Sequence, residues 1–207
     1  TGGKITLDGK DIRNITMKDL RDEIGFVPQK GVLFSGTIAS NLRFGKDDAT
    51  DAEIEKAAAI AQATEFIEAK DDKYETAIAQ GGTNVSGGQK QRLAIARAIA
   101  KDPKIFIFDD SFSALDLKTD AALRKAIRNM EGNPAVFIVS QRTSSIQHAD
   151  RILVLDDGKA AGLGTHEELL ETCPVYQEIY YSQFDEKAAK AVRENAANAG
   201  KAEKGGC

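Results

Sequence analysis

The stretch Ile105-Phe106-Ile107-Phe108-Asp109-Asp110 decides the fold class of this 207-residue chain. Four consecutive large apolar residues predict a strand buried on both faces, and such strands lie in the middle of a parallel sheet covered by helices. Two carboxylates follow at the carboxyl end of that strand, which is the edge where open α/β sheets collect their ligands. The stretch therefore predicts an α/β fold with a ligand site beside Asp109 and Asp110.

Strand and helix signals alternate on both sides of this stretch. Further apolar strands are predicted at residues 4–7, 24–27, 135–139 and 151–155. Helical spacing and capping boxes predict helices that begin near residues 17, 51, 86, 123 and 165. This alternation is typical of an open parallel sheet with flanking helices, and the run of short helices at about 36–72 predicts an all-helical insert.

Composition excludes several classes of function. The net charge is −4 and the pI is near 5.4, whereas general nucleic-acid binders carry a basic excess. No apolar run approaches the ~18 residues that span a membrane. Cys173 and Cys207 lack metal-ligand spacing, which suits a reducing cytosol. We expect one globular domain over 1–184 and a tail at 185–207 that buries too little apolar surface to fold.

The segment Ser86-Gly87-Gly88-Gln89 begins one of the predicted helices. Ser86 and Gln89 form a capping box, which explains a helix start without any ligand. The two glycines need another explanation, because glycine costs about 1 kcal/mol relative to alanine in a helix. Bare backbone in the first turn lets a phosphate approach the free N–H groups and the positive end of the helix dipole. From these residues alone, a helix cap and a phosphate site both remain open.

Asp109 and Asp110 also allow two interpretations. One carboxylate at the end of a buried strand could hold Mg²⁺ through water, and the second could orient an attacking water molecule. The alternative is a pair of acids at the start of the next helix, where they favour the helix dipole.

Taken together, four segments closely resemble the ATP-binding domain of ABC transporters. In chain order they are similar to its Q-loop, signature motif, Walker B strand and D-loop: Val27-Pro28-Gln29, Ser86 to Ala98, Ile105 to Asp110, and Ser113-Ala114-Leu115-Asp116. Two other segments are similar to exporters: Leu33 to Ile38 with Asn41, and Gly164 to Leu169. The resemblance extends from residue 1 to about 183. It implies a P-loop NTPase-like core with a helical subdomain at about 36–100 that includes the signature helix.

The resemblance also implies how the site works. Two such domains close head to tail around two ATP molecules, each held between the Walker motifs of one domain and the signature helix of the other. Gln29 and Asp109 would hold Mg²⁺. The other nucleotide-binding residues would be Ser86, Gly87, Gly88, Gln89 and Asp116. The expected partners are a second, non-identical ATP-binding domain and a transmembrane domain outside this chain, at the cytoplasmic face of the cell membrane, with no nucleic acid.

Three departures from the family pattern affect this site. No G-x-x-x-x-G-K-[ST] loop occurs, so we expect it upstream of Thr1, and we expect the chain to be a fragment that does not bind ATP usefully alone. Asp110 stands where the family has its catalytic glutamate, and it is one methylene shorter. Gln141 stands where the family has its switch histidine, and it cannot carry an imidazolium charge.

These departures lead to a specific hypothesis. Asp110 and Gln141 belong to the chain's own ATP site, whereas the intact signature segment serves the partner's site. The split pattern resembles the degenerate-site subunit of a heterodimeric exporter. Gln80-Gly81 also replaces the Glu-Arg pair common in exporters, and His148 and His166 match no catalytic position, so we expect both at the surface.

Two other functions remain open. The first is a truncated, catalytically inert regulatory or interaction module. The second is a soluble ABC-type ATPase that acts on DNA or ribosomes, which the acidic charge and the exporter-like segments disfavour.

Overall fold

Two compact units make up the chain. The computed structural model describes residues 2–184, and the units comprise residues 1–139 and 140–207. The predicted tail at 185–207 therefore lies outside the described residues. Within the described part of the chain, no helix is long and apolar enough to cross a membrane.

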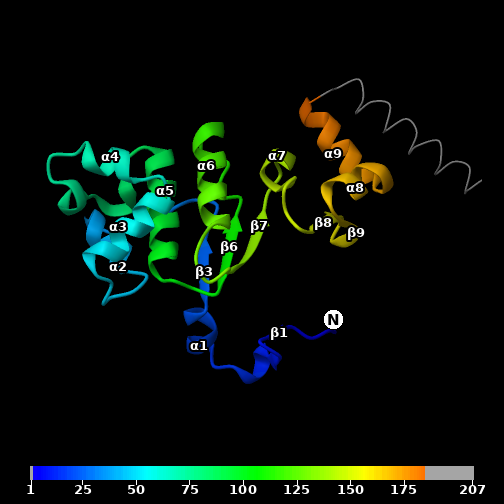
Figure 1. The fold of residues 1–207 in the computed structure, drawn as a ribbon, viewed down its shortest axis with the longest axis horizontal. Helices are drawn as coiled ribbons and strands as arrows, with labels where there is room; N and C mark the ends of the chain where they lie inside the picture. The colour runs from blue at the N-terminus through cyan, green and yellow to red at the C-terminus, as the bar shows by residue number, and fades with distance from the viewer. Residues whose placement is uncertain (1, 185–207) are drawn as a thin grey trace, which may run out of the picture. The chain divides into compact units, whose positions relative to one another are not determined.

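The described residues of the first unit form seven short strands together with several α-helices, and Figure 1 shows how the main elements are arranged. The strands are β1 (Thr6–Leu7), β2 (Lys10–Asp11), β3 (Ile24–Val27), β4 (Gly36–Thr37), β5 (Ala77–Ile78), β6 (Ile105–Asp109) and β7 (Ala135–Val139). The helices are α1 (Met17–Asp22), α2 (Ile38–Arg43), α3 (Asp51–Ile60), α4 (Thr64–Glu68), α5 (Gly87–Ala100) and α6 (Leu117–Arg128). Three 3₁₀ turns, Ile12–Asn14, Lys73–Glu75 and Gln80–Gly82, complete the unit.

The parallel sheet has the order β3-β6-β7, with β6 in the middle as predicted. Val27 on β3 pairs in register with Phe108 on β6, and both side chains are fully buried. Helix α5 packs beside β3 on this face, and a single apolar core joins the sheet to the helices. The α/β class with a parallel sheet is therefore confirmed.

The opposite face of the sheet differs from the prediction. Phe26, Ile107 and Phe137 lie in register across its three strands, yet Phe26 is 54% exposed and Phe137 is 60% exposed. Residues 135–139 were expected to form a strand buried on both faces, and this is wrong for the described residues. The reason is that the apolar core of the unit lies on the other face, since it includes Val27 and Phe108 but none of these three residues.

Helices α2 to α5 form the helical part of this unit (Figure 1). Helix α5 contacts both α2 and α3, through buried side chains such as Ile38, Ile54 and Leu93. Helices α2 and α3 each begin at a capping box, formed by Thr37 and Thr50. The region is not entirely helical, because β4 and β5 pair as a short antiparallel ladder.

The second unit contains α7 (Thr143–Ile146), β8 (Ile152–Asp156), β9 (Lys159–Gly164), α8 (His166–Thr172) and α9 (Pro174–Phe184). The strand predicted at 151–155 exists, but its expected place in the parallel sheet is wrong. It pairs antiparallel with β9, because Asp157 and Gly158 both adopt positive φ, 47° and 73°, as two-residue hairpin turns require.

A small apolar core holds the second unit together. The buried side chains of Ile152, Val154, Leu169 and Cys173 pack with Tyr176. Thr165 begins α8 with the predicted capping box. His166 was expected at the surface, but it is half-buried, and its Nδ1 lies 2.8 Å from the Tyr176 hydroxyl. His148 is exposed, as expected.

Candidate functional site

The carboxyl ends of the three parallel strands are tied together by hydrogen bonds. The Asp110 N–H, just beyond β6, donates to the Val139 carbonyl at the end of β7 (2.8 Å). On the other side, the fully buried Ser111 hydroxyl donates to the Val27 carbonyl at the end of β3 (2.8 Å). Residues that follow these strands are thereby held at one edge of the sheet.

Two of the predicted site residues meet at this edge. The Gln29 side-chain amide donates to the Asp110 carboxylate, with Nε2 and Oδ2 3.1 Å apart. Asp110 is half-buried and has a φ of 44°, a left-handed conformation that aspartate tolerates better than most residues. Asp109 is the last residue of β6 and is also half-buried. The structure thus places Gln29, Asp109 and Asp110 at the edge where the sequence predicted a ligand site.

The loop that carries Gln29 is held by a residue on α5. The Gly31 N–H donates to Gln91 Oε1 (2.9 Å), and Gln91 Nε2 donates to the Pro28 carbonyl (3.2 Å). Gln91 is only 2% exposed. Sequence reasoning assigned no role to Gln91 or Ser111. The sequence does contain a hint for Gln91: this polar residue lies one helical turn before the apolar Ile95, on the same face of a helix that is otherwise buried.

The predicted capping box at the start of α5 is present. The Ser86 hydroxyl accepts from the Gln89 N–H, and the Gln89 side-chain oxygen accepts from the Ser86 N–H, each at 3.2 Å. The N-terminal turn is open, since Ser86 and Gly87 are both exposed.

Packing among the described residues does not require glycine in this turn. A Cβ added at Gly87 would meet no atom within 4 Å, and one at Gly88 would meet only the Ala114 carbonyl at 3.5 Å. Neither glycine has a positive φ. The cost of two glycines in a helix therefore has no explanation in the folding of this unit, and free N–H groups face outward at the positive end of the helix dipole.

Asp116 has a local structural role. It is the N-cap of α6, and its carboxylate accepts from the Thr119 N–H (2.9 Å) and the Thr119 hydroxyl (2.7 Å). These hydrogen bonds, led by the backbone N–H, hold the pKa of Asp116 below its ordinary value. The residue is exposed, so its carboxylate remains accessible while it caps the helix.

Gln141 lies in the second unit. The residue is exposed, and its backbone carbonyl accepts from Gln183 Nε2 on α9 (2.7 Å). Gln183 also accepts from the N–H of Thr143 at the start of α7 (3.0 Å). The α9 helix thus fixes the backbone of the segment that carries Gln141, while the Gln141 side chain remains at the surface.

The residues at the sheet edge suit a cation that is shared with a ligand. Among residues 2–184, no group of three or more His, Cys, Asp or Glu side chains could hold a metal ion. Asp109 and Gln29 offer hard oxygen donors, and Mg²⁺ characteristically takes one or two carboxylates and completes its shell with water and phosphate oxygens. The donor set therefore fits Mg²⁺ that arrives with a nucleotide.

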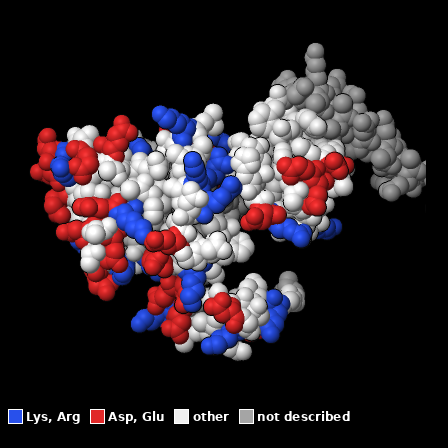
Figure 2. Space-filling model, in the orientation of Figure 1, with Lys and Arg blue, Asp and Glu red and all other residues white. Residues whose placement is uncertain are grey.

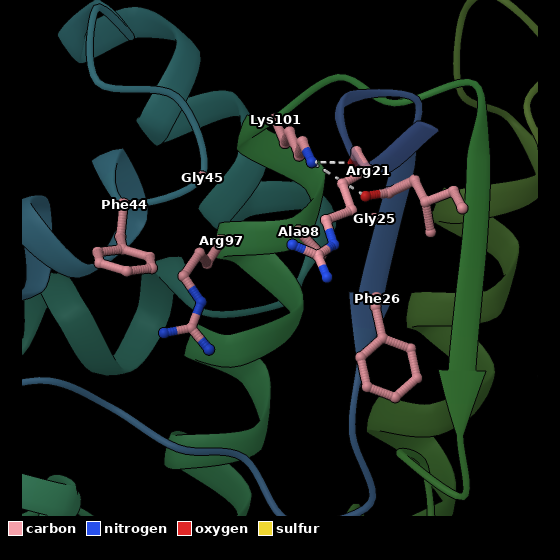
Figure 3. A pocket seen from close by; sticks show the side chains of 9 residues that line it. Arg21, Gly25, Phe26, Phe44, Gly45, Arg97, Ala98 and Lys101 are labelled. Carbon is pink, nitrogen blue, oxygen red and sulfur yellow. Dashed lines mark hydrogen bonds between the residues drawn. The ribbon is translucent and has the colours of Figure 1, made fainter. Parts of the chain in front are cut away.

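A separate hollow of about 300 Å³ lies between β3, α5 and the end of α2 (Figure 3). Its lining is mostly apolar with three basic side chains: Arg21, Ile24, Gly25, Phe26, Phe44, Gly45, Arg97, Ala98 and Lys101. Lys101 closes one end, where its ammonium group donates to the backbone carbonyls of Arg21 and Ile24.

Arg97, which lines this hollow, packs against a pair of aromatic rings whose centres are 4.3 Å apart. Its guanidinium carbon is 5.3 Å from the centre of the Phe34 ring and 6.0 Å from that of Phe44. One nitrogen donates to the Val32 carbonyl (2.9 Å), while the other terminal nitrogen has no hydrogen-bond partner among the described residues. Burial lowers the pKa of Arg97. Phe34 and Phe44 are 43% and 63% exposed, so this cluster presents apolar rings outward.

The loop at 80–82 lies close to the segment that contains Leu33 and Phe34. Gly81 has a φ of 68°, and its N–H donates to the Leu33 carbonyl (3.1 Å). Gln80 is exposed. The Gln80-Gly81 departure thus lies at the surface, next to the stretch that connects Gln29 to the aromatic cluster.

The charge pattern of the surface is mixed. Figure 2 shows acidic and basic side chains interspersed on the viewed face of the described residues, with many acidic groups over the side of helices α2 to α4. Nucleic-acid binders instead gather basic side chains on one face, so this view agrees with the acidic net charge.

Comparison with known proteins identifies the family. The family described as "ABC transporter" matches residues 1–113. An uncharacterised ABC transporter ATP-binding protein of Mycobacterium bovis is 46% identical over 88% of this chain and 32% of its own length. The ATP-dependent lipid A-core flippase of Desulfotalea psychrophila is 43% identical over 87% of this chain and 32% of its own length.

The structural comparison agrees. A bacterial Atm1-family ABC exporter with ATP bound superposes with a TM-score of 0.85 and 39% identity, over 89% of this chain and 33% of that protein. The chain spans about a third of the length of the relatives that it matches. These matches show that the chain belongs to the ATP-binding family of ABC transporters.

Proposed function

We propose that this chain is the ATP-binding portion of an ABC exporter with two unequal ATP sites. Its own site holds ATP and hydrolyses it slowly, while its signature helix completes a faster site on a non-identical partner. The observation that carries the proposal is the contrast between the open, glycine-lined start of α5 and the Asp110 carboxylate, which already accepts a hydrogen bond from Gln29.

In the chain's own ATP site, the carboxylate of Asp110 would lie too far from the attacking water molecule. A glutamate at position 110 would extend its carboxylate by one methylene, and a misplacement of about 1 Å at a reacting group can cost about 10²-fold in rate. One oxygen of the Asp110 carboxylate is also engaged by the Gln29 amide. When bound, Mg²⁺ would neutralise charge that develops on the phosphates. Asp109 and Gln29 would hold the ion, and Gln141 would donate a hydrogen bond without adding positive charge.

The first turn of α5 would bind the nucleotide that is held by the partner. The exposed Ser86 and Gly87 leave the first turn of α5 open. An anion at this position would meet backbone N–H groups and the positive helix end together. Gly88 and Gln89 complete the turn, and the capping box fixes its geometry before any ligand arrives.

A membrane domain would contact the chain at the aromatic cluster of Phe34, Phe44 and Arg97. This cluster exposes the Phe34 and Phe44 rings, and Phe44 and Arg97 line the apolar hollow (Figure 3). Exposed apolar patches of this kind mark interaction sites. A relative from Rhodopseudomonas palustris, 44% identical over 95% of this chain, is described as a beta-(1→2)glucan export ATP-binding/permease protein. This description places an ATP-binding domain and a permease domain in one protein. The transported substrate would be bound by that membrane domain.

The proposal is tested by restoring the two altered residues. In the full-length assembly, Asp110→Glu with Gln141→His should add ATP hydrolysis at this chain's own site, measured as phosphate released per assembly under saturating MgATP. Asp102→Glu, at an exposed position beyond α5, is the matched control and should change nothing. Unchanged turnover in the double variant would contradict the assignment, and an assembly without any turnover would indicate an inert module.

A further inference from the structure

We propose that Gln91 is a positioning residue that couples the signature helix to the loop carrying Gln29, so that this chain's two half-sites sense each other. The inference rests on the proposed function, because it assumes that Gln29 serves the chain's own ATP site and that the start of α5 serves the partner's site.

Gln91 forms hydrogen bonds with the backbone on both sides of Gln29 in the chain. Its amide nitrogen donates to the carbonyl of Pro28, and its amide oxygen accepts from the N–H of Gly31. These backbone groups lie on the two sides of Gln29 in the chain. A single side chain thus fixes the loop before and after the residue that reaches Asp110, and the Ser111 hydroxyl fixes the preceding strand end at Val27.

Packing alone does not call for glutamine at this position. Gln91 is 2% exposed, among apolar α5 neighbours such as Ala94 and Ile95 that are equally buried. A buried amide is costly unless its donor and acceptor are both used, and an apolar side chain would fill the space without that cost. Both groups of Gln91 are used on the Gln29 loop. The loop also approaches closely, since a Cβ added at Gly31 would lie 3.0 Å from Gln91 Oε1 and 3.2 Å from the Lys90 carbonyl.

The helix transmits displacement between the two half-sites. Gln91 lies little more than one turn (~3.6 residues) from Gly87 on α5, and the helix is continuous from Gly87 to Ala100. A shift of the signature turn on binding the partner's nucleotide therefore moves the Pro28 and Gly31 anchors with it. That movement changes the reach of Gln29 toward Asp110 and toward any Mg²⁺ held by Asp109.

The first arm of the test measures the clamp itself by amide hydrogen exchange in the full-length assembly. Gln91→Met keeps the length of the side chain and removes both hydrogen bonds, so peptides that contain Gly31 should exchange at least about tenfold faster, since exchange follows local opening. Gln91→Glu keeps the acceptor for Gly31 but sets a buried carboxylate oxygen against the Pro28 carbonyl, so exchange at Gly31 should also rise. Ile95→Ala truncates another buried α5 side chain and should leave this loop protected. Unchanged exchange in both Gln91 variants overturns the inference.

The second arm asks whether Gln91 acts through Gln29. The readout is the Mg²⁺ concentration that gives half-maximal labelling of this polypeptide by a photoreactive ATP analogue. Gln29→Ala and Gln91→Met should each raise it by about tenfold or more, and the double variant should match the single variants, because residues that act as a unit are non-additive. Ile95→Ala should leave it unchanged.

The outcomes separate the two claims. If Gln29→Ala raises the Mg²⁺ requirement and Gln91→Met adds a full independent increase, the coupling is wrong while the proposed function stands. If Gln29→Ala has no effect, the assumed role of Gln29 is wrong, and the inference is overturned with it. Equal effects of the single and double variants, together with faster exchange at Gly31, support the coupling.

Discussion

The Gln29 amide nitrogen lies 3.1 Å from a carboxylate oxygen of Asp110, and this contact joins residues 81 positions apart at the carboxyl edge of the sheet. Asp110 adopts a left-handed backbone there. The family resemblance places a glutamate at position 110, whose longer side chain would project further from the strand end. The hydrogen bond thus holds the shorter Asp110 carboxylate against the loop that carries Gln29.

Substitution of Gly87 should separate stability from function. Gly87→Ala should stabilise the unit by about 0.5 kcal/mol, because alanine is favoured in helices and the added Cβ meets no atom within 4 Å. The same variant should lower ATP turnover of the full-length assembly by at least about tenfold, because a methyl group occupies the approach of the phosphate. Chemical denaturation and phosphate release measure the two effects. A stable variant with full turnover would contradict the assigned role of this glycine.

Asn41 should be a major stability determinant of the helical part. The residue is 1% exposed, and its side chain bonds the N–H and carbonyl of Phe34 (2.8 and 2.9 Å) and the carbonyl of Thr37 (3.0 Å). Asn41→Leu removes these hydrogen bonds and leaves the Phe34 N–H and carbonyl without this buried partner, so it should cost about 2–4 kcal/mol in free energy of unfolding. Asn14→Leu, at an exposed position, should stay within about 0.5 kcal/mol. Urea unfolding compares the two, and equal costs would refute the account.

Glu53 should make stability depend on pH in the acid range. The Lys46 ammonium, and then the Thr50 N–H and hydroxyl, lower the pKa of Glu53 from 4.5 to about 2. The depressed folded-state pKa means that its stabilisation is complete above pH 4.5 and is lost as the pH falls toward 2. Glu53→Gln should therefore be less stable than the wild-type protein at pH 7, with a difference that shrinks below pH 4.5. Urea midpoints at several pH values measure this, with Glu55→Gln, an exposed neighbour on α3, as the control.

The aromatic cluster should matter for coupling more than for folding. Phe44 is 63% exposed, and its ring lies 4.3 Å from that of Phe34. Phe44→Ala should change the free energy of unfolding by less than about 1 kcal/mol, yet reduce transport-coupled ATP turnover in the full-length protein by about tenfold or more. Leu117→Ala, at a position 74% exposed on α6, should affect neither. Equal losses in both variants would show that Phe44 has no special contact.

Much of the fold was predictable because its signals are local. The predicted strand at residues 24–27 coincides with β3, and the capping boxes at Ser86 and Thr165 begin helices α5 and α8 as expected. These features depend on short-range alternation and on side chain to backbone hydrogen bonds. The burial of β7 and the pairing partner of β8 were not predictable in this way. An apolar strand has the same sequence pattern whether it lies at the centre of a sheet, at its edge or in a hairpin.

The sequence predicted which residues form the candidate site better than it predicted how those residues contact one another. Motif spacing indicated Gln29 and Asp110, but their direct hydrogen bond depends on the tertiary approach of two loops. Gln91 was missed for the same reason, since its partners Pro28 and Gly31 lie about 60 residues away along the chain. A polar residue on a buried helix face is a hint of such a contact, and only the fold identifies the partner.

The most direct test of unequal sites is ATP turnover of the full-length assembly with each half-site of this chain disabled in turn. Asp110→Asn removes the charge of one of the two carboxylates in the chain's own site. Gly87→Asp places a negative charge where the signature helix would meet the partner's phosphate. The account predicts that turnover stays within about twofold of wild type for Asp110→Asn and falls by more than about 100-fold for Gly87→Asp. A comparable loss in Asp110→Asn would contradict it, because the own site would then carry the hydrolysis assigned to the partner's site.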